Sequence, residues 1–102
     1  MQVTTTENAG RLSLKLNGRF DFHSHKDFRA AYGQALESAT VREVEIDFQH
    51  VDYLDSSALG MLLLLREKAE ASGKQVTLCG LAGTVKQVLD IANFGKLFTI
   101  RA

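Results

Sequence analysis

The strongest constraint on the fold is a strict alternation of apolar and polar residues, which recurs in separate parts of the chain. It spans residues 11–17, 43–49 and 75–80. Such alternation is typical of a half-buried strand, because successive side chains of a strand point to opposite faces of the sheet. A sheet covered by helices on both faces would instead show continuous apolar runs. The sequence therefore predicts a sheet with one buried face and with all helices packed on that face.

Segments with apolar residues at helical spacing separate these strands. The first is preceded by Ser24, which with Asp27 resembles a capping box. Because helices that join successive strands form right-handed crossovers, the order β-β-α-β-α-β-α-β predicts an α/β fold with a mixed, largely parallel sheet. The predicted helices span residues 25–38, 58–71 and 83–92, and two further strands span residues 2–6 and 97–100.

Charged residues are expected on the open face of this sheet. Arg11 and Lys15 stand on one strand, and Glu43, Glu45 and Asp47 stand on another. Opposite charges are therefore expected to meet across the sheet. Exposed pairs of this kind contribute little free energy, so a solvated face is the simplest interpretation.

Composition excludes several classes of function. The chain has 102 residues, which predicts one domain spanning 1–102, and its 12 Lys plus Arg balance 12 Asp plus Glu. No basic cluster is available to neutralise phosphates, so no nucleic-acid partner is expected. The longest apolar run, 58–65, is far shorter than the roughly 20 residues of a membrane span, so no membrane insertion is expected. Residues 2–7 lack the pattern of a secretory signal, which predicts a cytoplasmic protein.

Catalytic and metal sites are also disfavoured by the sequence. Cys79 is the single cysteine and is interpreted as a small core residue. Asp21, His23, His25 and also His50 could be imagined as metal ligands, but loop histidines are usually solvated, and no metal or other cofactor is predicted. Ser56 lacks the flanking glycines of a hydrolase nucleophile elbow, and no glycine-rich phosphate loop occurs. The chain is therefore expected not to be an enzyme.

The most informative segment is Asp55-Ser56-Ser57, directly before a predicted helix. All three residues are good N-caps, and one of them must satisfy the free amides of the first helical turn. The helix needs one capping side chain, and three residues could supply it. Hydroxyl groups are therefore left that the helix cap does not need. A phosphate at a helix N-terminus is compatible with the free amides and the positive end of the helix dipole. Gly60, in the same turn, leaves room for another molecule to approach the backbone.

The helix that follows carries four consecutive leucines, from Leu62 to Leu65. Leucines at four successive positions cover every side of a helix, which indicates burial. The remaining surface of this helix is expected to frame a docking site together with Met61 and the first helix. Its exposed residues are expected to include Arg66, Glu67 and Glu70.

Three motifs together resemble the STAS domain (sulphate transporter and anti-sigma factor antagonist), and in particular the small bacterial anti-sigma factor antagonists. The first is Leu-Asn-Gly-Arg-Phe-Asp at 16–21, the second Val-Asp-Tyr-Leu-Asp-Ser-Ser-Ala-Leu-Gly at 51–60, and the third Asn-Phe-Gly-Lys-Leu-Phe at 93–98. The second motif is the most specific. One departure is Ala58, where many relatives have Gly.

The resemblance implies that Ser56 is phosphorylated by a partner serine kinase and dephosphorylated by a metal-dependent serine phosphatase, with Ser57 as the second candidate. It also implies that the unphosphorylated protein binds an anti-sigma factor or equivalent regulator and that phosphorylation releases it. The residues expected to contact the partner are Asp21, Asp55, Ser57, Leu59 and Met61. The alternative is an unmodified structural subunit, resembling the STAS proteins of lipid-transport ATPase complexes, or a scaffold in a stress-sensing assembly.

Overall fold

The computed structural model describes residues 1–101. Within them, five strands form one sheet in the order β1-β2-β3-β4-β5. β1 and β2 form an antiparallel hairpin, and every other neighbouring pair is parallel. This confirms the predicted mixed, largely parallel sheet. The strands are β1 (Gln2–Asn8), β2 (Arg11–Phe20), β3 (Glu43–Leu54), β4 (Gln75–Cys79) and β5 (Thr99–Ile100).

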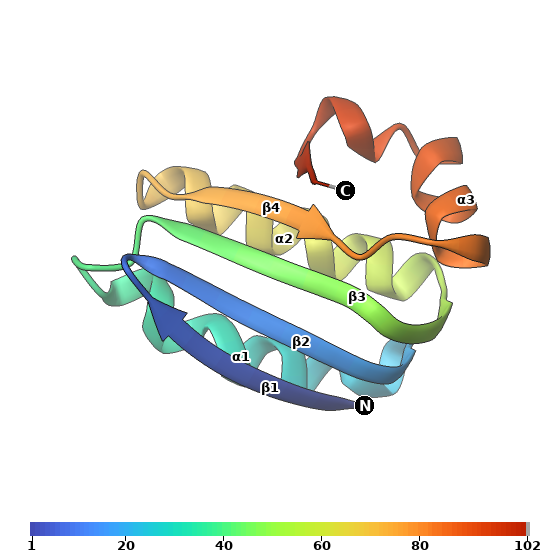
Figure 1. The fold of residues 1–102 in the computed structure, drawn as a ribbon, viewed down its shortest axis with the longest axis horizontal. Helices are drawn as coiled ribbons and strands as arrows, with labels where there is room; N and C mark the ends of the chain where they lie inside the picture. The colour runs from blue at the N-terminus through green and yellow to red at the C-terminus, as the bar shows by residue number, and fades with distance from the viewer. Residues whose placement is uncertain (102) are drawn as a thin grey trace.

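The helices leave one face of the sheet open. α1 and α2 lie behind the sheet in Figure 1, and α3 lies beyond the end of β4. The element order is the predicted one, with two short 3₁₀ turns added. The helices are α1 (His25–Glu37), α2 (Ser56–Ala71) and α3 (Gly83–Ile91), and the turns are η1 (Phe22–Ser24) and η2 (Phe94–Lys96). Within residues 1–101, no helix has the length and apolar character that crossing a bilayer requires.

The core fills the space between the sheet and the helices. It is built from the apolar side of each alternating strand and one side of each helix, as the pattern predicted. The strands contribute Leu12, Leu14, Leu16, Val44, Ile46, Phe48, Val76 and Leu78, and the two long helices contribute Phe28, Tyr32, Ala35, Ala58, Met61, Leu62, Leu65 and Ala69.

The position of Cys79 differs from the prediction. Val76 and Leu78 of β4 face the core, so Cys79 points to the open face, where it is half-buried and pairs in register with Asp47. Burial, together with the negative charges of Glu45 and Asp47, raises the pKa of its thiol to about 11. Cys79 is therefore a protonated thiol at neutral pH and not a core residue.

The leucine run of α2 is not uniformly buried either. Leu62 and Leu65 are fully buried, whereas Leu63 and Leu64 are 40% and 39% exposed. The helix rests on the sheet with one side only, so two of every four successive residues turn toward solvent. The prediction that all four leucines belong to the core is wrong for Leu63 and Leu64.

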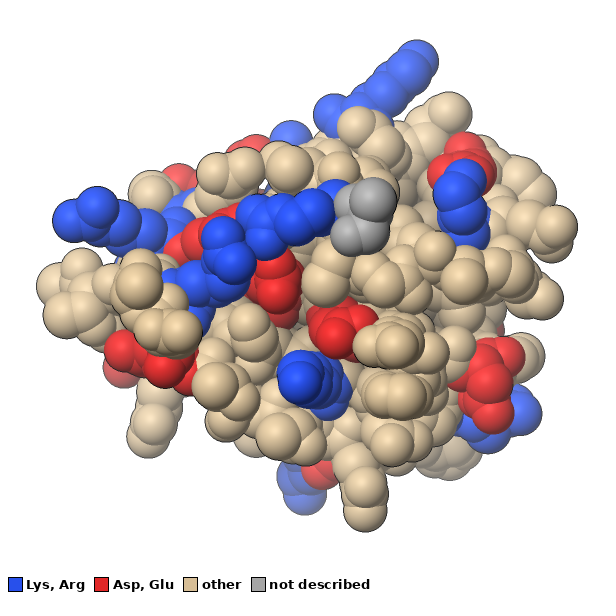
Figure 2. Space-filling model, in the orientation of Figure 1, with Lys and Arg blue, Asp and Glu red and all other residues tan. Residues whose placement is uncertain are grey.

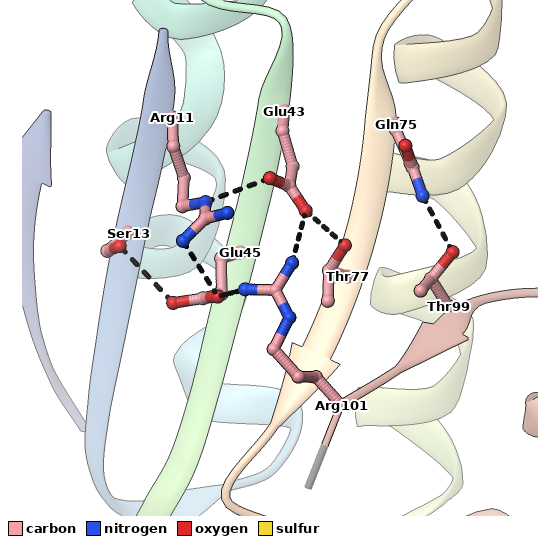
Figure 3. A network of polar contacts seen from close by, with 8 residues as sticks. All are labelled: Arg11, Ser13, Glu43, Glu45, Gln75, Thr77, Thr99 and Arg101. Carbon is pink, nitrogen blue, oxygen red and sulfur yellow. Dashed lines mark hydrogen bonds and ion pairs between the residues drawn. The ribbon is translucent and has the colours of Figure 1, made fainter. Parts of the chain in front are cut away.

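A polar network occupies part of the open face, which Figure 2 views directly. Arg11 Nε lies 2.8 Å from Glu43 Oε1, as the sequence predicted for this pair of strands. Arg101 reaches the carboxylates of both Glu43 and Glu45 from beyond β5, as Figure 3 shows. Lys15 and Asp47 are partners in register but form no ion pair within the described part of the chain.

Candidate functional site

Two of the sequence motifs meet at one edge of the sheet. β2 ends at Phe20 and β3 ends at Leu54, and these two residues are partners in the parallel register. The next residues, Asp21 and Asp55, therefore follow neighbouring strands at the same edge. The backbone N–H of Asp55 donates to the carbonyl oxygen of Phe20 at 3.4 Å, which ties the two turns together.

Asp55 is the N-cap of α2. Its backbone is extended, with φ −116° and ψ −177°, and its Oδ1 accepts a hydrogen bond from the N–H of Ala58 at 3.0 Å. This satisfies one of the free amides of the first turn. The sequence left three candidates for this cap, and the structure assigns it to Asp55. Ser56 and Ser57 are the first two residues of the helix.

Asp21 plays the corresponding part in the turn after β2. Its Oδ1 accepts from the N–H of His23 at 2.9 Å, and its own N–H donates to Ser24 Oγ at 3.1 Å. Ser24 Oγ in turn donates to the carbonyl oxygen of Arg19 at 2.9 Å. The prediction of Ser24 as the side-chain cap of α1 is wrong, because its backbone is already helical and its side chain turns back toward Asp21. Three side-chain hydrogen bonds therefore hold this turn, which lies beside the start of α2.

The two serines differ in accessibility. Ser56 is exposed and Ser57 is half-buried. Neither hydroxyl makes a hydrogen bond within residues 1–101, since Asp55 already serves as the cap. Ser56 therefore presents a hydroxyl group to solvent at the amide end of α2.

The remaining predicted contact residues of α2 lie at different depths. Leu59 is half-buried at the margin of the core. Met61 is only 9% exposed and belongs to the core cluster. The expectation that Met61 lies on the docking surface is contradicted, because its position on α2 turns its side chain inward among the other core residues. Asp55, Ser57 and Leu59 lie within three residues of Ser56 along the chain, and Asp21 follows the end of the neighbouring strand.

Two aromatic residues at this edge were not singled out from the sequence. Phe22 is 70% exposed on η1, next to Asp21. Tyr53 is 38% exposed, and the guanidinium of Arg19 lies 4.0 Å from the centre of its ring. Strand alternation would place Phe22 on the same buried face as Phe20. Only the turn that begins at Asp21 sends it outward, so the sequence carried no signal for its exposure.

The edge carries charges of both signs. Asp21, Asp52 and Asp55 lie in the two segments that end β2 and β3, Arg19 lies 3.6 Å from Asp21, and Lys26 lies beside Phe22 and His23. Asp55 precedes Ser56, so a phosphate on Ser56 would gain from the amides of α2 and would stand next to that carboxylate. His23 and His25 lie close by, yet no three metal-binding side chains gather anywhere in residues 1–101.

Comparison with known proteins shows matches along almost the entire chain. A sequence model of the family described as "Mlab, STAS domain" matches residues 1–100. A STAS-domain containing protein of Pseudomonas aeruginosa is 42% identical over 102 residues, covering 98% of this chain and 99% of that protein. An anti-sigma F factor antagonist of Paenibacillus polymyxa is 22% identical over 100 residues, covering 98% of this chain and 86% of the relative.

Solved structures show the same fold. The anti-sigma factor antagonist SpoIIAA in its unphosphorylated form has a TM-score of 0.77 and 20% identity, covering 99% of this chain and 88% of its own. The Bacillus cell fate determinant SpoIIAA in its phosphorylated form has a TM-score of 0.75 and 20% identity, covering 99% and 92%. The family match extends over both motifs that meet at Asp21 and Asp55. The chain therefore belongs to the STAS domain family.

Proposed function

We propose that this chain is an anti-sigma factor antagonist that works as a partner switch controlled by phosphorylation of Ser56. The unphosphorylated form binds an anti-sigma factor, a serine kinase or an equivalent regulator, and the phosphorylated form releases it. The observation that carries the proposal is the exposed Ser56 hydroxyl at the first position of α2. This hydroxyl is not needed as a helix cap, because Asp55 is the N-cap. The names of the relatives support it, since they include an anti-sigma factor antagonist and a structure in phosphorylated and unphosphorylated forms.

In this proposal the chain is the substrate of the kinase and of the phosphatase. The partner kinase supplies a nucleoside triphosphate. The bond from its terminal phosphorus to the bridging oxygen breaks as a bond to Ser56 Oγ forms, so that the nucleoside diphosphate leaves and the hydroxyl proton is released. A metal-dependent serine phosphatase hydrolyses the ester with water and restores the hydroxyl. Ser57, half-buried one position further into α2, is the second candidate acceptor. No enzymatic activity of the chain itself and no cofactor are needed.

The switch acts through the docking surface rather than through unfolding. A phosphoserine carries about −1.5 to −2 charges at neutral pH, and the amides at the start of α2 tolerate it. Docking would then require removing water from a dianion beside Asp21, Asp55 and the apolar margin at Leu59. A cost of about 3–5 kcal/mol, as for a buried unpaired charge, lowers affinity about a hundredfold to a few thousandfold.

The test compares Ser56→Ala with Ser56→Asp as bait in an extract of the source organism. We expect Ser56→Ala to retain a regulator whether or not the kinase is active, and Ser56→Asp to lose it. Ser57→Ala is the matched control, because it keeps the Ser56 hydroxyl and should still respond to phosphorylation. Mass spectrometry of a digest of the native protein should show a phosphate on the peptide that contains Ser56. If Ser56→Ala and Ser56→Asp both bind like the wild type, the proposed switch is wrong.

The alternative function is a permanent structural subunit of a lipid-transport ATPase complex or of a stress-sensing scaffold. The half-exposed Leu63 and Leu64 would suit such an interface, because a permanent contact requires no modifiable group. The same experiment separates the two functions. Co-purification with a transporter at equal yield from Ser56→Ala and Ser56→Asp would favour the structural subunit.

A further inference from the structure

The outer side of α2 carries a continuous exposed row that begins at Ser56. Ser56, Gly60, Leu63 and Glu67 are all exposed and are separated by four, three and four residues, which places them along one side of a helix. Leu64 is exposed beside them. We refer to these five residues as the α2 stripe. The opposite side of the helix, which packs on the sheet, carries fully buried residues at the same spacing: Ala58, Leu62, Leu65 and Ala69.

Gly60 forms a notch in the α2 stripe. A Cβ atom added at Gly60 would meet no other atom within 4 Å, so the fold itself does not require a glycine there. A glycine inside a helix costs about 0.5–1 kcal/mol relative to alanine. The missing side chain exposes the helix backbone one turn from Ser56, where a second chain can approach the helix axis closely.

The remainder of the α2 stripe has a defined chemistry. Leu63 and Leu64 are 40% and 39% exposed and supply its apolar part. Glu67 follows them and forms no ion pair within residues 1–101, whereas its neighbour Arg66 is paired with Glu70 at 2.9 Å. The stripe thus runs from the hydroxyl of Ser56, through a notch and two leucines, to an unpaired carboxylate.

We infer that an amphipathic helix of the regulator that this switch binds docks on the α2 stripe. This inference rests on the proposed function and specifies the chemistry of the partner. Rows of residues at these spacings are the surfaces through which two helices pack, and a small residue allows their axes to approach. The partner helix places a close-packed small residue over Gly60, apolar side chains against Leu63 and Leu64, and a Lys or Arg opposite Glu67.

The same placement explains why modification at one end of the stripe is effective. Ser56 and Gly60 are one turn apart on the same side of α2, so a phosphate on Ser56 stands in the path of a helix seated over Gly60. The partner helix would have to move away from the notch or bury the dianion. Either change removes the contacts with the leucines as well.

The probe for the test is the purified regulator that binds Ser56→Ala and not Ser56→Asp, with its dissociation constant measured by titration calorimetry. Gly60→Gln fills the notch, and we expect it to weaken binding about tenfold or more. Ala30→Gln is the control for added bulk, because Ala30 is an exposed residue inside α1 on the side that faces β1 and not α2. We expect Ala30→Gln to bind like the wild type and both variants to keep the wild-type fold by circular dichroism.

A second pair of variants tests the carboxylate. Glu67→Lys should weaken binding, with the loss reduced at high salt, whereas Glu7→Lys at an exposed position of β1 should have no effect. Wild-type affinity of both Gly60→Gln and Glu67→Lys would overturn the α2 stripe as the docking site while leaving the Ser56 switch intact. Equal losses for Gly60→Gln and Ala30→Gln would overturn it too. If no protein distinguishes Ser56→Ala from Ser56→Asp, the switch fails first and the stripe with it.

Discussion

At the start of α2, Asp55 has a structural role and the adjacent Ser56 has the proposed functional role. Asp55 has the extended backbone and accepts the amide of Ala58, so Ser56 needs to cap nothing. From the sequence, the cap could be narrowed to three oxygen-bearing residues but not to one. The choice is made by the sheet, because β3 continues to Leu54 and leaves Asp55 as the first residue outside it.

Removal of the Asp55 carboxylate should therefore lower stability by a moderate amount. Asp55→Ala loses the hydrogen bond to the amide of Ala58, and we expect the free energy of unfolding to fall by about 1 kcal/mol. Asp55→Asn keeps an acceptor oxygen and should recover most of this loss. Urea unfolding measures both variants.

Asp52→Ala is the control for charge, because Asp52 is an exposed carboxylate in the same segment without a hydrogen bond to the described chain. Its unfolding free energy should stay within about 0.5 kcal/mol of the wild type. A loss for Asp52→Ala as large as that for Asp55→Ala would contradict capping as the cause.

At the level of elements, the sequence predicted the five strands and the three α-helices but not the two 3₁₀ turns, and it underestimated the lengths of β1, β2 and β3. Alternation in β3 stops after Phe48, because Gln49 and His50 are both exposed. The register with β2 shifts at this point and again near Gly18, so that the buried positions become Val51 and Leu54. Irregularities of this kind insert residues that alternation cannot accommodate. They bring Leu54 into register with Phe20, so that Asp55 and Asp21 each follow the end of their strand.

The leucines of α2 show a similar limit on what the sequence predicts about a helix. Four consecutive leucines look uniformly apolar in sequence, and only the packing of α2 on the sheet decides which of them are buried. Those exposed by this packing, Leu63 and Leu64, form part of the α2 stripe, so the sequence located the helix but not its exposed surface. The neighbouring pair Leu62 and Leu63 isolates this effect, because the two residues differ only in the direction in which they point.

Leu62→Ala and Leu63→Ala should therefore have very different effects on stability. Leu62 is fully buried, and its truncation leaves a cavity that should cost about 2–5 kcal/mol. Leu63 is 40% exposed, and its truncation should cost about 1 kcal/mol or less. Both values follow from chemical denaturation monitored by circular dichroism. Equal losses would show that α2 does not rest on the sheet through the side described above.

At the scale of the whole molecule, the polar network on the open face joins residues that lie near opposite ends of the sequence. Arg11 begins β2, and Arg101 follows β5, yet both reach the carboxylate of Glu43 on the central strand (Figure 3). The sequence predicted the first of these contacts because the strands of Arg11 and Glu43 were evident. The second depends on β5, a strand of only two residues, and on the path of the chain through α3. Contacts this distant in sequence have no local signal.

The network on the open face leads us to predict how the stability of the protein depends on pH. Burial alone raises the pKa of Glu43, but hydrogen bonds from Thr77 and Arg11, together with the positive charges of Arg11 and Arg101, outweigh burial and lower it below its ordinary value of 4.5. A carboxylate whose pKa is lower in the folded state stabilises the fold above its unfolded pKa. That contribution is lost as the pH falls through the folded pKa.

Glu43→Gln should therefore be less stable than the wild type at pH 7, and the difference should shrink as the pH falls below 4.5. Glu37→Gln, a change at an exposed carboxylate of α1 without an ion pair in the described chain, should follow the wild type at every pH. Urea unfolding at a series of pH values between 3 and 7 provides the comparison. Because the Ser56 edge lies at the other end of β3, Glu43→Gln should leave regulator binding at pH 7 unchanged. A constant difference between Glu43→Gln and the wild type across this range would show that Glu43 titrates equally in the folded and unfolded states.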